Sequence, residues 1–282
     1  MNIHYDFNNL KEIRNAVVTT GSFDGVHNGH KVILERLKKI AFDIGGETVL
    51  ITFHPHPRQV LYPDTYGKDF RLISTQREKI ELLTKAGIDH LIIASFTLEF
   101  SKISSVSFVR DILLKKVQAR KIITGYNHHF GHNREGDTEL MMQLGKQYGF
   151  DVEEIPEQDI QQETVSSVTI RKALMEGDIP KANKYLDHNF IISGKCQSVT
   201  PQLLRKNSDR YSIQPEEENK LIPPDGTYAV SIIDDEAKYS GKCFITNNKE
   251  HPLEATIEFE ADEPLNCQSE ITTLLFHQKI AT

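Results

Sequence analysis

The sequence has 282 residues, of which 38% are hydrophobic, and its formal net charge is −7. This length and composition are typical of a globular protein with one large or two modest domains. A general nucleic-acid binder carries a basic field, so the acidic balance argues against nucleic acid as the main partner. No stretch approaches the roughly 18 apolar residues that span a membrane, which argues against a membrane protein.

The amino terminus has no basic start followed by an apolar run, so no secretory signal is expected. The three cysteines, Cys196, Cys243 and Cys267, are far apart and form no Cys-x-x-Cys pair. Their number and spacing predict free thiols rather than a zinc site or a disulfide framework. A reducing cytoplasm is therefore the expected location.

Residues 16 to about 155 alternate short strand-like runs with helix-like periods. Strands are expected at 16–20, 47–53, 91–94 and 121–124, and helices at 30–41, 74–86 and near 105–115. Thr75 and Glu78 have the spacing of a capping box, and Gly87 is the expected end of its helix. Such alternation predicts parallel strands joined by helical crossovers.

After about residue 187, and after a helical segment that ends near Leu186, the pattern changes. Short strand-like segments are expected at 194–199, 226–233, 239–246 and 253–260, with an exposed loop at 215–220. Proline and glycine separate these segments, as in antiparallel β-structure. The sequence thus predicts an α/β domain with a parallel sheet at 1–187 and a small antiparallel, barrel-like β domain at 188–282.

The first candidate site is the glycine-rich segment GSFDGVHNGH at 21–30, which follows the first expected strand. Ligands of parallel sheets bind outside the carboxyl ends of the strands, and the start of a helix offers N–H donors to phosphate. His27 and His30 are three residues apart and would face the same way on a first helical turn. The segment is neither a dinucleotide fingerprint nor a P-loop, and a glycine turn with two surface histidines is the plain alternative.

The second candidate site is the segment TVSSVTIRKALMEG at 164–177. Ser166 or Ser167 is expected to cap a helix that runs to about Glu176. The serine hydroxyls, the N–H groups and Arg171 could together hold a pyrophosphate leaving group, since the planar guanidinium makes paired bonds to phosphate. The alternative is a capped helix with a surface arginine.

Two more segments follow expected strands at the same sheet edge. GYNHHFG at 125–131 could hold a flat ring by stacking and by hydrogen bonds to its edge. FHPHP at 53–57 ends the second strand, where His54 and His56 could contact substrate. A surface loop and a proline-fixed turn are the alternatives, but the convergence of several such segments carries more weight than one motif.

Taken together, GSFDGVHNGH, TFHPHP, GYNHHFGHNREG and VSSVTIR resemble, in this order, the motifs of the prokaryotic bifunctional riboflavin kinase/FAD synthetases. The resemblance covers about residues 12 to 194. It implies a Rossmann-like nucleotidyltransferase domain of the HxGH type, in which ATP and FMN react with Mg²⁺.

The resemblance also implies roles for individual residues, with no metal ligand among them. The expected catalytic residues are His27, His30 and Arg171. The residues expected at ATP are Gly21, Ser22, Phe23, Asp24, Gly29, Ser166 and Ser167. The residues expected at the flavin are His54, Pro55, Pro57, Asn127, Phe130 and Gly131.

The sequence departs from the family pattern in three places. Val168 stands where the second motif usually has threonine, and His128 stands where the third usually has an aromatic residue. In the carboxyl-terminal part the family's Pro-Thr-Ala-Asn signature of the kinase barrel is missing, although Glu254 lies where the catalytic glutamate is expected. We therefore expect a degenerate kinase domain.

The leading hypothesis is an FMN adenylyltransferase that makes FAD and pyrophosphate. A bifunctional enzyme that also phosphorylates riboflavin is the second hypothesis. A non-catalytic flavin or nucleotide binder and a transferase with another phosphate acceptor are the remaining ones.

Overall fold

The computed structural model describes residues 1–282 except 9, 66, 68, 126–127, 156–158, 161–162, 200–209, 248–254, 264, 266–268 and 282. The chain divides into two compact units. The first comprises Met1–Phe70 and Ile80–Thr164, and the second comprises Arg71–Lys79 and Val165–Thr282. The second unit thus begins 23 residues before the predicted domain start at 188 and includes one segment from far upstream.

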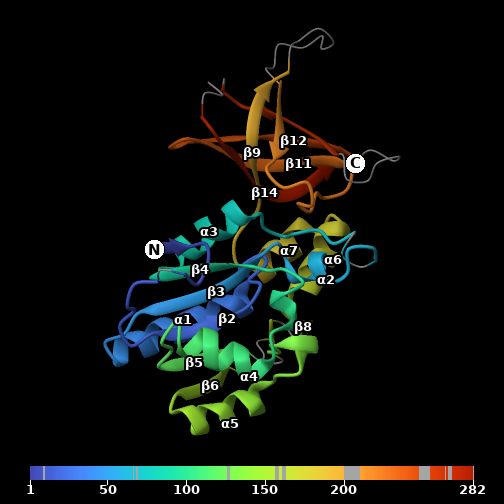
Figure 1. The fold of residues 1–282 in the computed structure, drawn as a ribbon. Coiled ribbons are helices and arrows are strands. Elements are labelled where there is room, and N and C mark those ends of the chain that lie inside the picture. The colour runs from blue at the N-terminus through green and yellow to red at the C-terminus, as the bar shows by residue number, and fades with distance from the viewer. Residues whose placement is uncertain are drawn as a thin grey trace. The chain divides into compact units, whose positions relative to one another are not determined.

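The first unit is built on a six-stranded parallel sheet in the order β1-β4-β3-β2-β5-β6. Its strands are β1 (Asn2–His4), β2 (Val17–Thr20), β3 (Thr48–His54), β4 (His90–Ser95), β5 (Lys121–Gly125) and β6 (Asp151–Ile155). The chain runs outward from β2 through β3 to β4 and then crosses to β5 and β6 on the other side of β2 (Figure 1). The strand order therefore reverses between β2 and β5, and open parallel sheets bind ligands at such a reversal, outside the carboxyl ends of the strands.

Helices cover both faces of this sheet, which buries its apolar strands on both sides. The main helical elements of the unit are α1 (Asn28–Asp43), α2 (Pro57–Leu61), α4 (Ser105–Ser107), the π-helical η2 (Phe108–Leu114) and α5 (Thr138–Tyr148). Two short 3₁₀ turns, η1 (Phe100–Lys102) and η3 (His132–Arg134), and the two-residue strands β7 (Asp159–Ile160) and β8 (Glu163–Thr164) complete it. Helix α3 (Gln76–Lys85) starts in the second unit and ends in the first.

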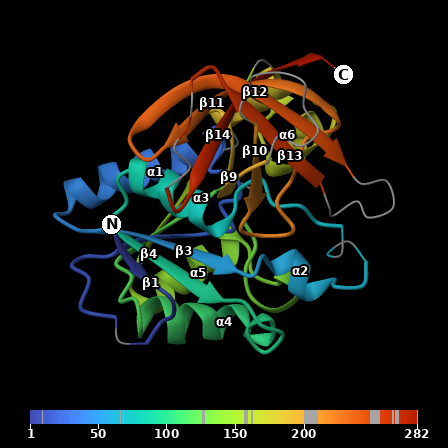
Figure 2. The same ribbon diagram turned by 90° about the horizontal axis from the view of Figure 1, so that it is seen from above.

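The alternation of strand side chains decides which helix covers which face. Val18 and Ile51 pack in one core with residues of η2 and α5. Val17 and Leu50 pack in the other core with residues of α1 and with Leu83 of α3. Figure 2 shows α1 and α3 on one side of the strands and α4 on the other. The expected α/β architecture is confirmed.

The second unit contains a closed antiparallel barrel in the order β10-β13-β12-β11-β14-β9, with β9 and β10 closing it. Its strands are β9 (Phe190–Ser198), β10 (Arg210–Pro215), β11 (Gly226–Asp234), β12 (Ala237–Asn247), β13 (Ala255–Ala261) and β14 (Thr272–Ala281). Buried aromatic rings pack against one another inside it, as Phe190 and Tyr228 do on Phe276. The expected β-barrel is confirmed.

Two helices, α6 (Ser167–Met175) and α7 (Ile179–Leu186), belong to this barrel unit. Asn183 of α7 donates through Nδ2 to the Phe276 oxygen at 2.8 Å and accepts from the Phe190 N–H at 2.7 Å. One side-chain amide thus joins α7 to both β14 and β9. These contacts explain why the second unit includes the two helices that precede the barrel.

One expectation about the second unit holds except at its end, and another is wrong. The segment 215–220 was expected to be an exposed loop, and residues 216–219 do form a loop in which Glu216 and Glu218 are exposed, but the Lys220 side chain is 1% exposed and forms an ion pair with Glu78. Free thiols were expected, but Cys196 on β9 is disulfide-bonded, since spacing along the sequence does not reveal which cysteines the fold brings together. Cys243 is a buried free thiol, and Cys267 lies outside the described residues.

Among the described residues, no helix is both long enough and apolar enough to span a membrane.

Candidate functional site

The segment from Gly21 to His30 forms a tight turn between β2 and the start of α1. Phe23, Gly25 and Val26 have φ values of 46°, 85° and 41°, which lie in the left-handed region. This conformation is costly for a β-branched residue such as valine and is found mainly where the surrounding structure enforces it, often at functional sites. Phe23 and Val26 are both buried in the core beneath the turn, and this packing holds the backbone in place.

His27 and His30 lie together at the first turn of α1. His27 is the N-cap residue, and its Nδ1 accepts a long hydrogen bond of 3.4 Å from the His30 N–H. The two rings stack with centroids 3.6 Å apart, and the His30 ring also lies 4.5 Å from the Phe23 ring. With Nδ1 as the acceptor, a neutral His27 carries its proton on Nε2, which makes Nε2 a donor. The pair provides imidazole groups at a helix start, where the macrodipole favours anions.

The other residues predicted at ATP in this turn have structural partners. The Gly21 N–H donates to the Ile51 oxygen at 3.0 Å and extends the pairing of β2 with β3. The Ser22 oxygen accepts from Thr52 Oγ1 at 3.0 Å. Asp24 is fully buried, and Gly29 lies in the first turn of α1. The turn is thus fixed to β3 at two places before any ligand arrives.

The segment after β3 is arranged by its prolines and histidines. His54 is the last residue of β3 and is exposed, and Pro55 follows it through a cis peptide bond. His56 caps α2 through a capping box with Gln59, and its ring stacks on Phe70 at 4.3 Å. Pro57 is the first residue of α2. His56 therefore serves the turn, whereas His54 points its side chain to solvent.

The segment after β5 reaches back to the first turn. Tyr126 and Asn127 lie outside the described residues. His128 Nε2 lies 3.2 Å from Thr20 Oγ1, the last residue of β2, and its ring stacks on Phe130 at 6.0 Å. Burial and, to a smaller extent, the nearby charges of His129 and Arg134 together lower the pKa of His128 to about 4. The imidazole is therefore neutral near pH 7.

Phe130 and Gly131 fix the shape of this loop. Phe130 is buried and forms a reciprocal pair of main-chain hydrogen bonds with Gly136. Gly131 has a φ of 76°, and a Cβ atom there would lie 2.5 Å from the Ser105 nitrogen. Both the left-handed backbone and the close approach require glycine.

The sheet order brings these three segments together at one edge. β2 pairs with β3 on one side and with β5 on the other, all in parallel. The turn after β2, the end of β3 and the loop after β5 therefore lie side by side, at the reversal of strand order. This placement is where an open α/β sheet binds its ligand.

The predicted phosphate-binding serines and Arg171 belong to the second unit. Ser166 is the N-cap of α6, and its hydroxyl accepts from the Thr169 N–H at 3.2 Å while Thr169 Oγ1 accepts from the Ser166 N–H at 3.1 Å. Ser167 is the first residue of the helix, and the Val168 side chain is 60% exposed. The helix ends at Met175, one residue before the expected end.

Arg171 is held by main-chain oxygens of its own unit. Its Nε donates to the Arg71 oxygen at 2.8 Å, and its Nη1 donates to the Ser167 oxygen at 3.0 Å. Two of the five guanidinium donors thus fix the plane of the group. Sequence reasoning missed Arg71, because a contact made by a main-chain oxygen leaves no trace in the residue type.

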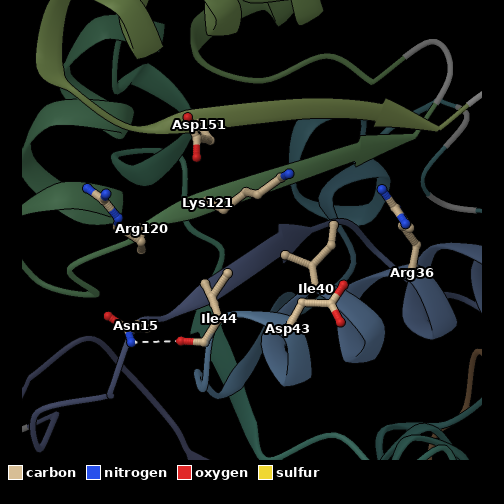
Figure 3. Close-up of a pocket in the computed structure, with 8 residues that line it drawn as sticks. All are labelled: Asn15, Arg36, Ile40, Asp43, Ile44, Arg120, Lys121 and Asp151. Atoms are coloured by element: carbon tan, nitrogen blue, oxygen red, sulfur yellow. Dashed lines mark hydrogen bonds between the residues drawn. The ribbon is translucent and has the colours of Figure 1, made fainter.

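A cavity of about 420 Å³ lies at the opposite, amino edge of the sheet (Figure 3). It is lined by Asn15, Arg36, Ile40, Asp43, Ile44, Arg120, Lys121 and Asp151. Two of its cations are already paired, since Arg36 Nε and Lys121 Nζ lie 2.5 Å and 3.0 Å from the carboxylate oxygens of Glu153. None of the predicted site residues lines this cavity.

Comparison with known sequences gives matches over most of the chain. The model of the FAD synthetase family matches residues 9–169. A bifunctional riboflavin kinase/FMN adenylyltransferase of Buchnera aphidicola is 37% identical over 66% of this chain and 60% of its own length. The enzyme of the same description from Listeria monocytogenes is 30% identical over 94% of this chain and 80% of its own length. The chain therefore spans less than two thirds of the first relative and most of the second.

Comparison with solved structures gives a match over the whole fold. A crystal structure described as a macrolide-efflux protein from Streptococcus pneumoniae has a TM-score of 0.83, covering 99% of this chain and 90% of that one. At 21% sequence identity, this likeness concerns the fold alone.

Proposed function

The chain belongs to the FAD synthetase family, and from this premise we propose that it transfers the AMP moiety of ATP to FMN, forming FAD and pyrophosphate. The observation that carries the proposal is the turn at the reversal of strand order. There, a strained, buried backbone presents the stacked His27 and His30 at the start of α1. This arrangement supplies hydrogen-bond donors and a positive helix end to a phosphate chain.

The reaction needs little covalent chemistry from the protein. A phosphate oxygen of FMN attacks the α-phosphorus of ATP in line, the bond to the bridging oxygen breaks, and pyrophosphate leaves with the electron pair. Because the attacking phosphate is already an anion, no protein nucleophile is required. Positioning of the two phosphates and neutralisation of developing charge then provide the rate.

Individual residues supply these two effects. His27 and His30 would donate hydrogen bonds to the phosphate oxygens of ATP. Arg171, with Ser166 and Ser167, would hold the leaving pyrophosphate, for which a planar guanidinium is well suited. On the flavin side, His54 and the loop that contains Phe130 and Gly131 would contact the ring. Pro55 and Pro57 would shape that side of the site.

Mg²⁺ belongs to the proposal as the companion of ATP. Mg²⁺ keeps several waters and binds phosphate oxygens readily, so the triphosphate can bring the ion with it. Within the part of the chain that the structure describes, no group of three potential His, Cys, Asp or Glu ligands comes together. We therefore assign no step to a protein-held ion.

One chromatographic assay tests the proposal. The purified protein is incubated with ATP and Mg²⁺, with FMN in one sample and riboflavin in the other. We expect FAD from FMN and no product from riboflavin, because the Pro-Thr-Ala-Asn signature is missing from the sequence. FMN or FAD from riboflavin would instead establish a bifunctional enzyme. Absence of product from both would contradict the proposed activity and favour a binding role or another phosphate acceptor.

The residue roles make a separate prediction. His30→Ala and Arg171→Ala should each lower kcat for FAD formation by about 10²-fold, because each removes a group that stabilises charge in the transition state. The matched controls are His4→Ala, on the edge strand β1, and Arg210→Ala, whose guanidinium pairs with Glu258 and Glu260 on the barrel. Thermal unfolding checks that each variant is folded. Near wild-type rates for His30→Ala and Arg171→Ala would refute their assignment.

We also propose that the protein works in the cytoplasm, where ATP is abundant, on small-molecule substrates. The formal net charge of −7 supports a site for small anions over a surface for nucleic acid.

A further inference from the structure

The second unit contains a fully buried ion pair that no part of the proposed reaction uses. Lys220 Nζ lies 2.5 Å from Glu78 Oε2, and the two side chains are 1% and 0% exposed. The same ammonium donates to the Ile73 oxygen at 2.5 Å and lies 4.5 Å from the centroid of the Phe190 ring. Charges removed from water to this degree are expensive and need several partners.

Glu78 has such partners both in its own helix start and on the barrel. Its carboxylate accepts from the Thr75 N–H at 2.9 Å, which is the capping box expected from the sequence. It also accepts from the Ser193 N–H of β9 at 2.9 Å. A local helix cap is therefore also a tie between the start of α3 and the barrel.

Main-chain hydrogen bonds strengthen the tie beside the ion pair. The Leu72 N–H donates to the Asn219 oxygen, and the Leu221 N–H donates to the Leu72 oxygen, each at 2.8 Å. Leu72 thus pairs with the chain on either side of Lys220. Leu72, Ile73 and Glu78 thus bind this segment to β9 and to the residues that precede β11.

The same segment holds Arg171 at its other end. The Arg71 oxygen, next to Leu72 in the chain, accepts from Arg171 Nε at 2.8 Å. A continuous path therefore runs within this unit from Lys220 and Ser193 through Glu78 and residues 71–73 to the guanidinium. Arg171, at the end of this path, is its one residue with a proposed role in the reaction.

A buried ion pair is weak evidence for a role in stability, because replacing one by apolar side chains of similar volume is often neutral or stabilising. The geometry that the pair imposes on residues 71–73 is therefore the property to test. Resting on the proposed function, we propose that Glu78 and Lys220 are positioning residues for Arg171 in adenylyl transfer. The barrel then contributes to FAD synthesis by fixing the segment that orients this guanidinium.

A small displacement of Arg171 should affect the chemical step more than substrate binding. Misplacing a reacting group by about 1 Å can reduce a rate by up to about 10²-fold. We expect Lys220→Met to lower kcat for FAD formation by about tenfold, with KM for FMN within about twofold of wild type. An unspecific loss of folded protein would lower kcat equally in every background.

Coupling to Arg171 distinguishes positioning from a structural role. The test measures kcat for the full-length wild type, Lys220→Met, Arg171→Ala and the double variant. If Lys220 acts through Arg171, Lys220→Met has no further effect once Arg171 is alanine, because coupled residues are not additive. If the two losses multiply, or if either single variant keeps wild-type kcat, the proposal is overturned.

Two more variants keep the test valid if Lys220→Met leaves Glu78 unpaired and unfolds the unit. Glu78→Met/Lys220→Met removes both buried charges together, so it should fold while still releasing the segment, and it should show the same non-additivity with Arg171→Ala. A wild-type kcat in this folded variant also overturns the proposal.

Arg210→Met, which breaks the ion pairs between β10 and β13, is the matched control. It should change kcat by the same factor in the wild-type and in the Arg171→Ala background, because it has no path to Arg171. Failure of the wild type to make FAD would instead refute the proposed function.

Discussion

His128 stands where the resembling family has an aromatic residue, and the imidazole makes contacts of two kinds. Its ring stacks on Phe130 as another aromatic ring could, while its Nε2 lies within hydrogen-bond distance of Thr20 Oγ1. The second contact ties the loop after β5 to the end of β2, at the reversal of strand order. Histidine at this position therefore keeps a ring contact with Phe130 and adds a polar contact with Thr20 at the candidate site.

The lowered pKa of His128 makes the free energy of unfolding depend on pH. The pKa of His128 is about 4 in the folded protein, against 6.5 for an unperturbed histidine. Above about pH 7 neither state is protonated at this residue, so its contribution is fully present. As the pH falls below 6.5 the unfolded chain takes up a proton that the folded chain does not, and stability falls by at most about 1.4 kcal/mol per pH unit.

Urea unfolding between about pH 4.5 and about pH 7.5 measures this slope. His128→Gln should flatten it, because glutamine keeps hydrogen-bonding groups but does not titrate. His4, whose pKa burial and His90 also lower, contributes in the same direction to both proteins and cancels in the comparison. Equal slopes for the two proteins would show that His128 is not the titrating group.

For single residues of the candidate site, the sequence predicts those features that depend on the spacing of neighbouring residues along the chain. The three-residue separation of His27 and His30 predicted a common orientation, and the structure stacks the two rings, although His27 precedes the helix as its N-cap residue. The left-handed Val26 and the role of the Arg71 oxygen have no such signal, because each is imposed by the surrounding fold.

Helix α6 shows how an element can serve the reaction through its first turn. Its capping box fixes Ser166 and Thr169 to each other, so the start of the helix is ordered by its own side chains. The N–H groups at the start of a helix, together with the positive end of its dipole, form a common binding site for phosphate. The position of this turn should therefore affect catalysis as well as helix stability.

Ser166→Ala should lower the free energy of unfolding by about 1 kcal/mol, the usual effect of losing an N-cap. It should also lower kcat for FAD formation. The matched control is Asp178→Ala in α7, where Asp178 Oδ1 accepts from the Lys181 N–H at 3.1 Å. Both variants should lose similar stability by urea unfolding, and only Ser166→Ala should lose activity. Equal activities would place Ser166 outside the site.

Helices with a regular repeat of apolar residues were predictable from the sequence. Short strands that form only because they pair with a neighbouring strand were not. The periods at 30–41 and 74–86 predicted α1 and α3, because an apolar face repeats along each helix. β1 has only three residues and exists because it pairs with β4. β14 was not predicted, although Leu274 and Phe276 alternate with exposed or half-buried neighbours as a strand requires.

At the scale of the whole molecule, the division of the chain differs from the one that composition suggests. The change of pattern after residue 187 marks the first barrel strand closely, since β9 begins at Phe190. Composition does not reveal that α6, α7 and Arg71–Lys79 pack with the barrel, because those contacts are distant in sequence. The boundary at 187 stays a prediction about independent folding.

A fragment that ends at Asp187 tests that boundary. It lacks Ser193, Lys220 and the strands that contact α7, so Glu78 loses its partner cation and the apolar face of α7 loses its cover. Unpairing a buried charge costs about 3–5 kcal/mol. We expect the fragment to unfold at lower urea concentration than the full chain and to make FAD more slowly. Equal stability and equal activity would establish 1–187 as a complete domain.

The ion pair between Glu78 and Lys220 joins residues 142 positions apart in the chain. At a synthesis rate of about 5–20 residues per second, Lys220 leaves the ribosome about 7–30 s after Glu78. During that interval the part of the chain already synthesised can form the parallel sheet, while Glu78 at the start of α3 still lacks its partner Lys220. Completion of this segment is thus a late step in the synthesis of every molecule, and it depends on the arrival of the barrel.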